Sequence, residues 1–512
     1  MTQAGDWRTQ PRGLGELLTL QANAEPDRPA LTFEGETLTR SELDRRANRM
    51  ARALQQLGVV QDDFVSIVLP NGFMHHIVAF AIWKLGATPL PLAAKLPDIE
   101  LRAIVELAKP KLIIGPDPAR LPGFNVIPQV TPDPTLSDAP LPEKIAKAWK
   151  AITSGGSTGR PKVIVDAGES RSVVIQEDRL LKIEPDDVVL HPAPIYHNAT
   201  FAQTNWGLAW GAHVIEVAKF DALEWLKLVE RYKVRWAYLV PTMMSRIWNL
   251  PDEEKAKYDL SSLRVVMHMA APCPAWLKQA WIKWLGPQKI WEVYAGTEGL
   301  GGTLLSGQEW LDHPGTVGKP RGVTKIFDED GKEVPTGVVG EIFFKTPGGP
   351  GSTYRYIGAE MRQRDGWETL GDMGRLDEDG YLYLADRRTD MIVTGGANVF
   401  PAEIESALEA HPAVATSAVI GLPHADFGRV PHAIISLRPG AAAPTAASLE
   451  AFLAERLARY KLPYTFEISQ EPLRDDAGKM RRSALRDERE ARAAAGETFL
   501  PLRASQRAGA GA

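Results

Sequence analysis

Two lysines that lie far apart in this 512-residue chain each stand in a short glycine-containing motif. The first motif, Thr153 to Lys162, reads TSGGSTGRPK, and the second, Pro472 to Lys479, reads PLRDDAGK. Serine and threonine hydroxyls can donate hydrogen bonds, and glycines let backbone N–H groups approach an anion closely. The first motif therefore predicts a loop that wraps phosphate. It is not a Walker A loop, because that pattern requires Ser or Thr directly after the lysine, and here Val163 follows.

Strand and helix signals alternate on both sides of the first motif. The predicted strands cover 64–69, 112–115, 188–190, 237–240 and 265–267, and the predicted helices cover 41–58, 73–85, 198–211, 241–249 and 275–285. A cap-like Ser-Glu-Leu-Asp stretch predicts that the first of these helices begins at Ser41. Strands that alternate with helices indicate parallel α/β layers.

The chain changes character after Gly315. Short apolar runs are separated there by turn signals such as Asp365-Gly366, which indicates an antiparallel, β-rich subdomain. Farther on, the sequence predicts helices over 401–409 and 448–460 and strands over 415–421 and 433–437. We therefore expect an α/β protein whose large N-terminal domain, 1–386, combines stacked α/β subdomains with a β-rich subdomain. A small, mobile α+β domain, 387–512, would follow and carry Lys479 and a disordered tail.

Composition argues against several classes of protein. Charged residues make up 24% of the chain and the formal net charge is −5, so no nucleic-acid or anionic-membrane partner is expected. No stretch reaches the roughly 18 uncharged apolar residues of a membrane span. Cys273 is the single cysteine, which suits a reducing, cytoplasmic location and is expected to be a small buried residue rather than a nucleophile. A homodimer is left open.

Four further short motifs complete a pattern with the Thr153–Lys162 loop. Their order and spacing resemble the adenylate-forming (ANL) superfamily, which holds the acyl-CoA synthetases, the adenylation domains of nonribosomal peptide synthetases and the luciferases. The resemblance runs from about Leu14 to about Leu485. The four motifs are YAGTE at Tyr294–Glu298, LGD at Leu370–Asp372, Asp386-Arg387 and Gly478-Lys479.

The resemblance implies an acid–CoA ligase that works in two steps. A carboxylate attacks the α-phosphate of ATP to give an acyl-adenylate and pyrophosphate, and the thiol of coenzyme A then displaces AMP. Positioning and electrostatic stabilisation by Mg²⁺ and cationic side chains would supply most of the catalysis. The implied catalytic residues are Lys479, His197, Thr297 and Glu298, with Glu298 as the Mg²⁺ ligand. The implied ATP-binding residues are Thr153, Ser154, Gly155, Gly156, Ser157, Thr158, Gly159, Lys162, Ala271, Tyr294, Asp372 and Arg387.

Several of these roles have a physical reason. Lys479 would reach the site only when the small domain closes for adenylation, and a compact charge on a long stem can be delivered and withdrawn. The carboxylate of Asp372 can accept hydrogen bonds from both ribose hydroxyls, and Arg387 would lie near the ribose and phosphate. Gly395 and Gly396 would line the pantetheine tunnel of coenzyme A, because close backbone approach requires a missing Cβ.

The chain departs from the family pattern at three positions. Family members usually carry Gly where this chain has Val163 after the loop lysine, and Gly where it has Ala295. The hinge position is Thr389 rather than Asp or Lys, although Asp390 beside it could share the role. The domain swing therefore stays an expectation whose details are open.

The residues expected to bind the acid follow the strands of the large domain. Met243 and Met244 would form adaptable walls, and the Gly299–Gly302 stretch would leave room by lacking side chains. No Asp is placed to bind an amino group, which argues against an α-amino acid. We therefore expect a bulky, hydrophobic acid, and the GGSTGR wording resembles that of ligases for polycyclic bile, steroid and diterpenoid acids. The expected acid-binding residues are Tyr196, Asn198, Phe201, Tyr238, Met243, Met244, His268, Gly296, Gly301 and Gly302.

Three alternatives remain beside the acid–CoA ligase. The chain could be an adenylating enzyme that passes its adenylate to another protein or carrier without making the thioester. It could be a catalytically silent binding protein, although the intact site residues Lys162, Glu298, Asp372, Arg387 and Lys479 argue against this. A luciferase-type oxygenase is the third alternative.

Overall fold

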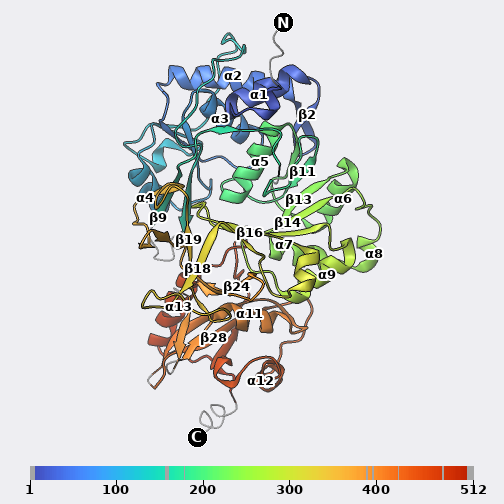
Figure 1. The fold of residues 1–512 in the computed structure, drawn as a ribbon, viewed down its shortest axis with the longest axis vertical. Coiled ribbons are helices and arrows are strands. Elements are labelled where there is room, and N and C mark those ends of the chain that lie inside the picture. Colours follow the sequence, from blue (N-terminus) through green and yellow to red (C-terminus); the bar gives the residue numbers. More distant parts are fainter. Residues whose placement is uncertain are drawn as a thin grey trace.

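The computed structural model describes residues 6–155, 161–177, 179–387, 390–394, 397–424, 426–475 and 478–503. A large domain, coloured blue through yellow to light orange in Figure 1, and a small domain, coloured deeper orange to red, follow each other along the long axis of the molecule. The predicted mixed α/β fold with a large N-terminal and a small C-terminal domain is confirmed.

The centre of the large domain is a nine-stranded sheet of order β17-β16-β15-β14-β13-β11-β12-β2-β3. Its strands run parallel from β2 to β15, and β3, β16 and β17 join antiparallel at the edges. The parallel strands therefore end along one edge, where open α/β sheets bind their ligands. The strands are β2 (Pro29–Phe33), β3 (Glu36–Thr39), β11 (Val188–His191), β12 (His213–Glu216), β13 (Trp236–Leu239), β14 (Val265–His268), β15 (Ile290–Ala295), β16 (Gly302–Ser306) and β17 (Pro320–Arg321).

Helices connect the parallel strands of this sheet, as the alternating pattern predicts. Helix α5 joins β11 to β12, and α9 joins β14 to β15. Among the helices of the described residues, none combines the length and the apolar character needed to cross a bilayer. The helices of this layer are α1 (Leu14–Ala24), α5 (Asn198–Trp210), α6 (Ala222–Tyr232), α7 (Pro241–Trp248), α8 (Asp252–Lys255), α9 (Ala275–Leu285) and α10 (Gly307–Asp312), with a 3₁₀ turn η1 (Trp7–Thr9).

A second, smaller parallel sheet of order β5-β4-β6-β7 belongs to the same domain. Helices α2 and α3 pack against each other next to it, and the buried side chains of α3 join the core of the central sheet. The elements are α2 (Arg40–Gln56), β4 (Phe64–Ile67), α3 (Phe73–Lys84), β5 (Thr88–Pro91), α4 (Asp98–Ala108), β6 (Leu112–Ile114), η2 (Pro118–Arg120) and β7 (Val126–Ile127), and a two-stranded ribbon joins β1 (Arg12–Gly13) to β10 (Arg171–Ser172).

The β-rich part predicted after Gly315 contributes strands to two antiparallel sheets. One has the order β20-β9-β8, and its strands β8 and β9 carry the two ends of the first glycine-containing motif, which precedes the predicted part in the chain. The other has the order β21-β22-β19-β23-β24, with β18 paired to β19. The strands are β8 (Ala151–Gly155), β9 (Pro161–Asp166), β18 (Val323–Phe327), β19 (Gly340–Lys345), β20 (Tyr354–Ile357), β21 (Gln363–Arg364), β22 (Trp367–Glu368), β23 (Asp372–Leu376) and β24 (Leu382–Arg387).

The small domain has a sheet of order β26-β25-β28-β29-β30, with β27 paired to β28, and a separate apolar core. The hairpin of β27 and β28 is longer than the two predicted strands, because their pairing continues to His424 and Gly428. The elements are β25 (Ile392–Thr394), β26 (Ala397–Val399), α11 (Pro401–Glu409), β27 (Val414–His424), β28 (Gly428–Leu437), α12 (Ala446–Ala454), η3 (Arg459–Lys461), β29 (Thr465–Ile468), α13 (Arg482–Ala494) and β30 (Leu500–Pro501).

The predicted start of α2 at Ser41 is wrong. The helix begins at Arg40, and Thr39 is its N-cap. The Thr39 side chain accepts from the backbone N–H of Glu42, and the Glu42 carboxylate accepts from the backbone N–H of Thr39, which is a complete capping box. Thr39 is also the last residue of β3, so the strand signal concealed the cap.

The predicted helix over 448–460 is also wrong, because α12 ends at Ala454 and a 3₁₀ turn follows at Arg459–Lys461. Leu457 and Leu462 are both buried in the small-domain core. They are five positions apart and would face different sides of one continuous helix. The break lets both side chains enter the same core.

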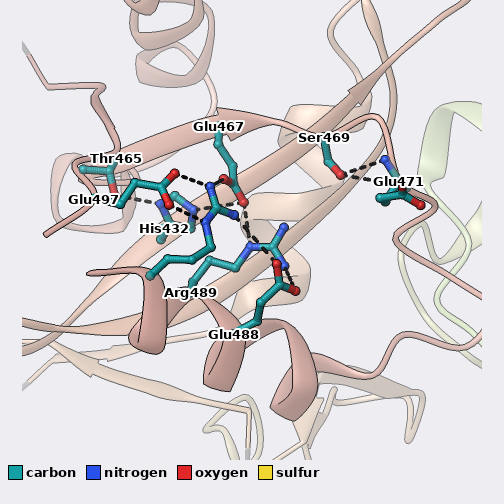
Figure 2. A network of polar contacts seen from close by, with 9 residues as sticks. His432, Thr465, Glu467, Ser469, Glu471, Glu488, Arg489 and Glu497 are labelled. Carbon is teal, nitrogen blue, oxygen red and sulfur yellow. Dashed lines mark hydrogen bonds and ion pairs between the residues drawn. The ribbon is translucent and has the colours of Figure 1, made fainter. Parts of the chain in front are cut away.

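Helix α13 is joined to the small-domain sheet by a network of ion pairs, shown in Figure 2. The carboxylate of Glu467 on β29 accepts from Nε of Arg489 at 2.7 Å and lies 3.0 Å from Nη2 of Arg492. Burial raises the pKa of Glu467, but its contacts with His432 and Arg489 outweigh burial and bring the pKa to about 2. The network therefore fixes the helix that follows Lys479.

Candidate active site

The two ends of the first glycine-containing motif lie on the paired strands β8 and β9. Ser154 pairs with Lys162 and Gly155 pairs with Pro161 in an antiparallel register. The predicted phosphate-binding residues Gly156, Ser157, Thr158 and Gly159 lie outside the described residues, and so does the side chain of Ser154. Thr153, on β8, pairs with Val163. The hairpin therefore places Lys162 at the base of the predicted loop.

Lys162 and Glu298 are brought together by Tyr356, which the sequence patterns do not identify. Lys162 Nζ donates to the Tyr356 hydroxyl at 3.0 Å and lies 3.4 Å from Oε1 of Glu298. The Tyr356 hydroxyl donates to the same Oε1 at 2.6 Å, and burial and the carboxylate of Glu298 raise the pKa of Tyr356. The pairing of β20 with β9 brings Tyr356 here, because it sets Tyr356 opposite Ile164, two positions after Lys162.

Glu298 has the properties of a cation ligand. Its side chain is buried, its Oε1 is held by Tyr356 and Lys162, and its backbone oxygen accepts from Thr353. Its Oε2 has no hydrogen bond to the described residues. Mg²⁺ prefers oxygen ligands and usually takes one or two protein carboxylates beside phosphate oxygens. The residues present therefore fit Mg²⁺ that is bound together with ATP, with Thr297 next to the ligand in the chain.

The predicted ribose-binding residues lie on neighbouring strands. The Tyr294 hydroxyl donates to Oδ2 of Asp372 at 2.7 Å. Asp372 on β23 pairs directly with Arg387 on β24, although the side chain of Arg387 lies outside the described part of the chain. The end of β15 and the start of β23 thus place an aromatic ring and a carboxylate side by side.

The amino-terminal end of α5 collects polar atoms that have no partners among the described residues. These atoms are His197 Nε2, Asn198 Oδ1 and Thr200 Oγ1. Burial, and secondly the charge of Lys479, lower the pKa of His197 to about 3, so its imidazole is neutral at physiological pH. A helix amino terminus attracts anions because its first N–H groups are unpaired and its dipole is positive there. This end of α5 can therefore receive a carboxylate.

The lysine of the second motif comes from the small domain, and its charge influences His197 at the amino terminus of α5. The backbone N–H of Lys479 donates to Oδ1 of Asp475 at 2.8 Å, and the Asp475 N–H donates to the Lys479 carbonyl at 2.9 Å. Gly478 has φ +74, and a Cβ there would lie 3.2 Å from Cγ2 of Val240 and Oγ1 of Thr242. The lysine loop is therefore braced internally and packed against the start of α7.

Other predicted acid-binding residues lie after β11, on α5, and at the end of β13 and the start of α7. Tyr238 stacks on His191 with ring centroids 4.8 Å apart. Phe201 packs against Trp149 and Trp83 in the core. Met243 and Met244 are buried on α7, and the Tyr196 ring lies against that of His197. Their contacts with the acid stay predictions.

His268 faces the opposite side of the central sheet from Tyr238. Its cross-strand neighbours are Leu239 and Glu292, whereas Tyr238 pairs with Met267. Burial lowers the pKa of His268 to about 4, and neither ring nitrogen has a hydrogen-bond partner among the described residues. Burial also raises the pKa of the Cys273 thiol to about 12, which keeps it protonated and unreactive.

The expectation that Gly301 and Gly302 leave room for the acid is wrong. A Cβ at Gly301 would lie 2.6 Å from Cδ1 of Phe344, and one at Gly302 would lie 2.5 Å from the backbone oxygen of Tyr294. At Gly296 the nearest atom would be Cδ1 of Leu370, also at 2.6 Å. These glycines are small because neighbouring protein atoms fill the space. The predicted coenzyme A contacts Gly395 and Gly396 lie outside the described residues.

Comparison with known families agrees with this geometry. Residues 18–354 match the family described as AMP-binding enzyme, and residues 403–479 match the AMP-binding enzyme C-terminal domain.

Individual relatives cover nearly the whole chain. A fatty acid–[acyl-carrier-protein] ligase of Streptomyces coeruleorubidus is 29% identical over 93% of this chain and 96% of the relative. A feruloyl-CoA synthase of an Amycolatopsis species is 31% identical over 93% and 99%. The o-succinylbenzoate CoA synthetase of Bacillus subtilis, solved with its acyl-adenylate intermediate, superposes with a TM-score of 0.78 at 25% identity, covering 93% of this chain and 98% of that one.

Proposed function

Because this chain belongs to the AMP-binding enzyme family and is an AMP-forming acid–CoA ligase, we propose that it activates a bulky, ring-bearing carboxylic acid. The enzyme uses ATP and Mg²⁺ to make an acyl-adenylate and then transfers the acyl group to coenzyme A. Support for a ring comes from the relatives named for feruloyl and o-succinylbenzoyl substrates. Buried Met243 and Met244 supply apolar, adaptable walls.

The observation that carries the proposal is the buried, neutral imidazole of His197 at the amino terminus of α5, whose Nε2 has no hydrogen-bond partner among the described residues and which the charge of Lys479 also influences. The acid carboxylate would accept hydrogen bonds from the first N–H groups of α5 and from the neutral imidazole of His197. Lys479 would neutralise the charge that builds up as this carboxylate approaches the α-phosphate. Asn198 and Tyr196 would complete the walls around the reacting group.

The large domain would bind ATP through the residues around Glu298. Lys162 and the backbone of the Thr153–Gly159 loop would hold the β- and γ-phosphates, and Thr297 would donate to the α-phosphate. Asp372 would accept from the ribose hydroxyls, with Arg387 beside it, while Tyr294 and Ala271 would border the adenine. When bound at Glu298, Mg²⁺ supplies positive charge against the leaving pyrophosphate.

The small domain would alternate between the two half-reactions. With the domain boundary between residues 386 and 387, a rotation there would withdraw Lys479 and bring Gly395 and Gly396 to the pantetheine arm of coenzyme A. The comparisons favour this thioester-forming route over an enzyme that only hands on its adenylate. A cytoplasmic location and a homodimer complete the proposal.

The experiment is pyrophosphate release with Mg-ATP across short, fatty, aryl and polycyclic acids, followed by detection of the thioester after coenzyme A is added. We expect release with ring acids and thioester formation from the same acids. Faster turnover of acetate or of an unbranched fatty acid than of any ring acid would contradict the proposed acid class. Release without thioester would contradict the second half-reaction.

A further inference from the structure

A buried amide on α5 lacks a strong acceptor for its hydrogens. Gln203 lies six residues after His197, and its side chain is almost completely buried, with 1% of the residue exposed. Its Oε1 lies 2.8 Å from Nε2 of His191, the last residue of β11. Its Nε2 lies 3.4 Å from Sδ of Met269 and has no other partner in the described part of the chain. A thioether sulfur is only a weak acceptor.

The His191 ring determines which way this amide faces. Burial lowers the pKa of His191 to about 3, so the imidazole is neutral and carries one N–H. Its Nδ1 has no partner among the described residues, and the N–H that finds an acceptor is therefore the one on Nε2, which donates to Oε1 of Gln203. A flipped amide would leave the imidazole N–H unpaired and aim an oxygen at the sulfur. Gln203 consequently directs its NH₂ group away from β11.

Gln203 lies at the ligand-binding edge of the central sheet. Its partners His191 and Met269 are the end of β11 and the residue directly after β14. Ala270 follows with φ +74, a conformation that is strained for a residue with a side chain and that is concentrated at functional sites. This turn separates Met269, beside the amide, from Ala271, a predicted ATP contact.

We propose that Gln203 selects acids whose rigid ring skeleton carries a hydrogen-bond acceptor, a carbonyl, ether or hydroxyl oxygen, remote from the carboxylate. Six residues of α-helix span about 9 Å, so the acceptor would lie roughly that far from the carboxylate end at His197. The amide NH₂ would exchange the weak thioether contact for this oxygen. The inference rests on the proposed function and names a polar feature of an acid that is otherwise apolar.

Two acids of equal size test the inference. 6-Methoxy-2-naphthoate carries the acceptor oxygen, and 6-ethyl-2-naphthoate replaces that oxygen with a methylene group. We expect the enzyme to prefer the methoxy acid by at least about tenfold in kcat/KM for pyrophosphate release, because the ethyl acid leaves the amide without an acceptor. In Gln203→Leu we expect a ratio near one, with turnover of the ethyl acid showing that the variant is folded.

A second variant tests whether the orientation of the Gln203 amide, and not the packing around it, causes the preference for the methoxy acid. His191→Phe keeps an aromatic ring against Tyr238 but removes the donor that orients the amide, so the methoxy preference should fall although Gln203 is unchanged. Equal turnover of both acids by the unmodified enzyme, or an unchanged ratio in Gln203→Leu, would overturn the inference while leaving adenylation established. Silence with both naphthoates would also overturn it, and the wider acid panel would then judge the proposed function separately.

Discussion

At the scale of single residues, Tyr356 connects Lys162, which is predicted to bind phosphate, to Glu298, which is predicted to bind Mg²⁺. Removing its hydroxyl in Tyr356→Phe deletes the contacts with Lys162 Nζ and Glu298 Oε1 together. Because both partners carry charge, we expect the KM for Mg-ATP to rise by about tenfold, with a smaller change in the KM for the acid. Steady-state kinetics with each substrate varied in turn measures this split.

The control is Tyr383→Phe, which removes a tyrosine–carboxylate contact between Tyr383 on β24 and Asp377 in the turn between β23 and β24. It should leave both KM values unchanged. Equal effects of the two variants would show that Tyr356 acts through general stability and not through the ATP site.

Lys479 is the second residue whose substitution should slow one step of the reaction and spare another. In Lys479→Ala we expect adenylation to fall by at least about a hundredfold, because a positioned charge at the reacting phosphate is lost. Thioester formation from preformed adenylate should be spared, since the lysine is needed only in the first half-reaction. Single-turnover measurement of each half-reaction checks this. The matched control is Lys461→Ala, which removes another small-domain lysine, one that is paired with Glu403. Near-normal pyrophosphate release by Lys479→Ala would contradict the catalytic role of Lys479.

At the scale of elements, the cap of α2 gives a test in stability. Thr39→Ala removes the side-chain oxygen that accepts from the Glu42 N–H and should cost about 1 kcal/mol of unfolding free energy. Ser41→Ala changes a residue already inside the helix and should stay within about 0.5 kcal/mol. Urea unfolding followed by circular dichroism compares the two variants. A larger loss for Ser41→Ala would restore the cap that the sequence predicted.

A comparison of predicted and observed helix bounds shows how far the sequence specifies the ends of the elements. Helix α9 was predicted with its observed bounds because Pro274 and Gly286 delimit an apolar pattern. The start of α2 was missed because Thr39 also satisfies a strand, and the break after Ala454 depends on where two distant leucines are buried. Motif spacing predicted Asp372 and Arg387 as site residues, and the structure pairs them across β23 and β24. Tyr356 and Gln203 belong to no motif, and only the packing of separate elements brings them to their partners.

At the scale of the whole molecule, one contact between the domains bears on the domain swing. Arg438 of the small domain donates to Oδ1 of Asn249 at 2.7 Å and lies over the Trp276 ring. Asn249→Ala removes the hydrogen bond between the domains without changing the Arg438 contacts with the Trp276 ring and the Val414 carbonyl. We expect the adenylation rate to fall by a few fold while thioester formation from preformed adenylate does not fall, because the orientation that delivers Lys479 is less populated. A fall of both rates together would contradict this role.

Acid stability is a second property of the whole molecule. Burial lowers the pKa of His191 to about 3 and that of His268 to about 4. Between pH 6.5 and 4 the unfolded chain therefore binds more protons than the folded one, and each histidine should remove roughly 1–2 kcal/mol of stability by pH 5. All 14 tryptophans precede residue 368, so their fluorescence during urea unfolding reports this loss in the large domain.

Two variants test whether a buried histidine of the large domain causes this loss of stability at low pH. His268→Asn should reduce the difference between the unfolding midpoints at pH 7 and pH 5, whereas His424→Asn in the small-domain hairpin should not. Burial also raises the pKa of Glu409 to about 7. Glu409 lies in the small domain, so its titration should not alter the tryptophan fluorescence that reports unfolding of the large domain. A midpoint that is the same at both pH values would contradict the prediction.

The hydrogen bond from His191 to Gln203 also has an evolutionary consequence. The group that would meet the acid is the amide of Gln203, but the group that decides whether it offers a donor or an oxygen is a histidine behind it. Replacing that histidine with a side chain that accepts rather than donates would reverse the amide and exchange the preferred acids. Descendants of this enzyme could thus acquire new substrates without altering a residue in contact with them. A survey restricted to contact positions would group such enzymes together and assign them the same acid.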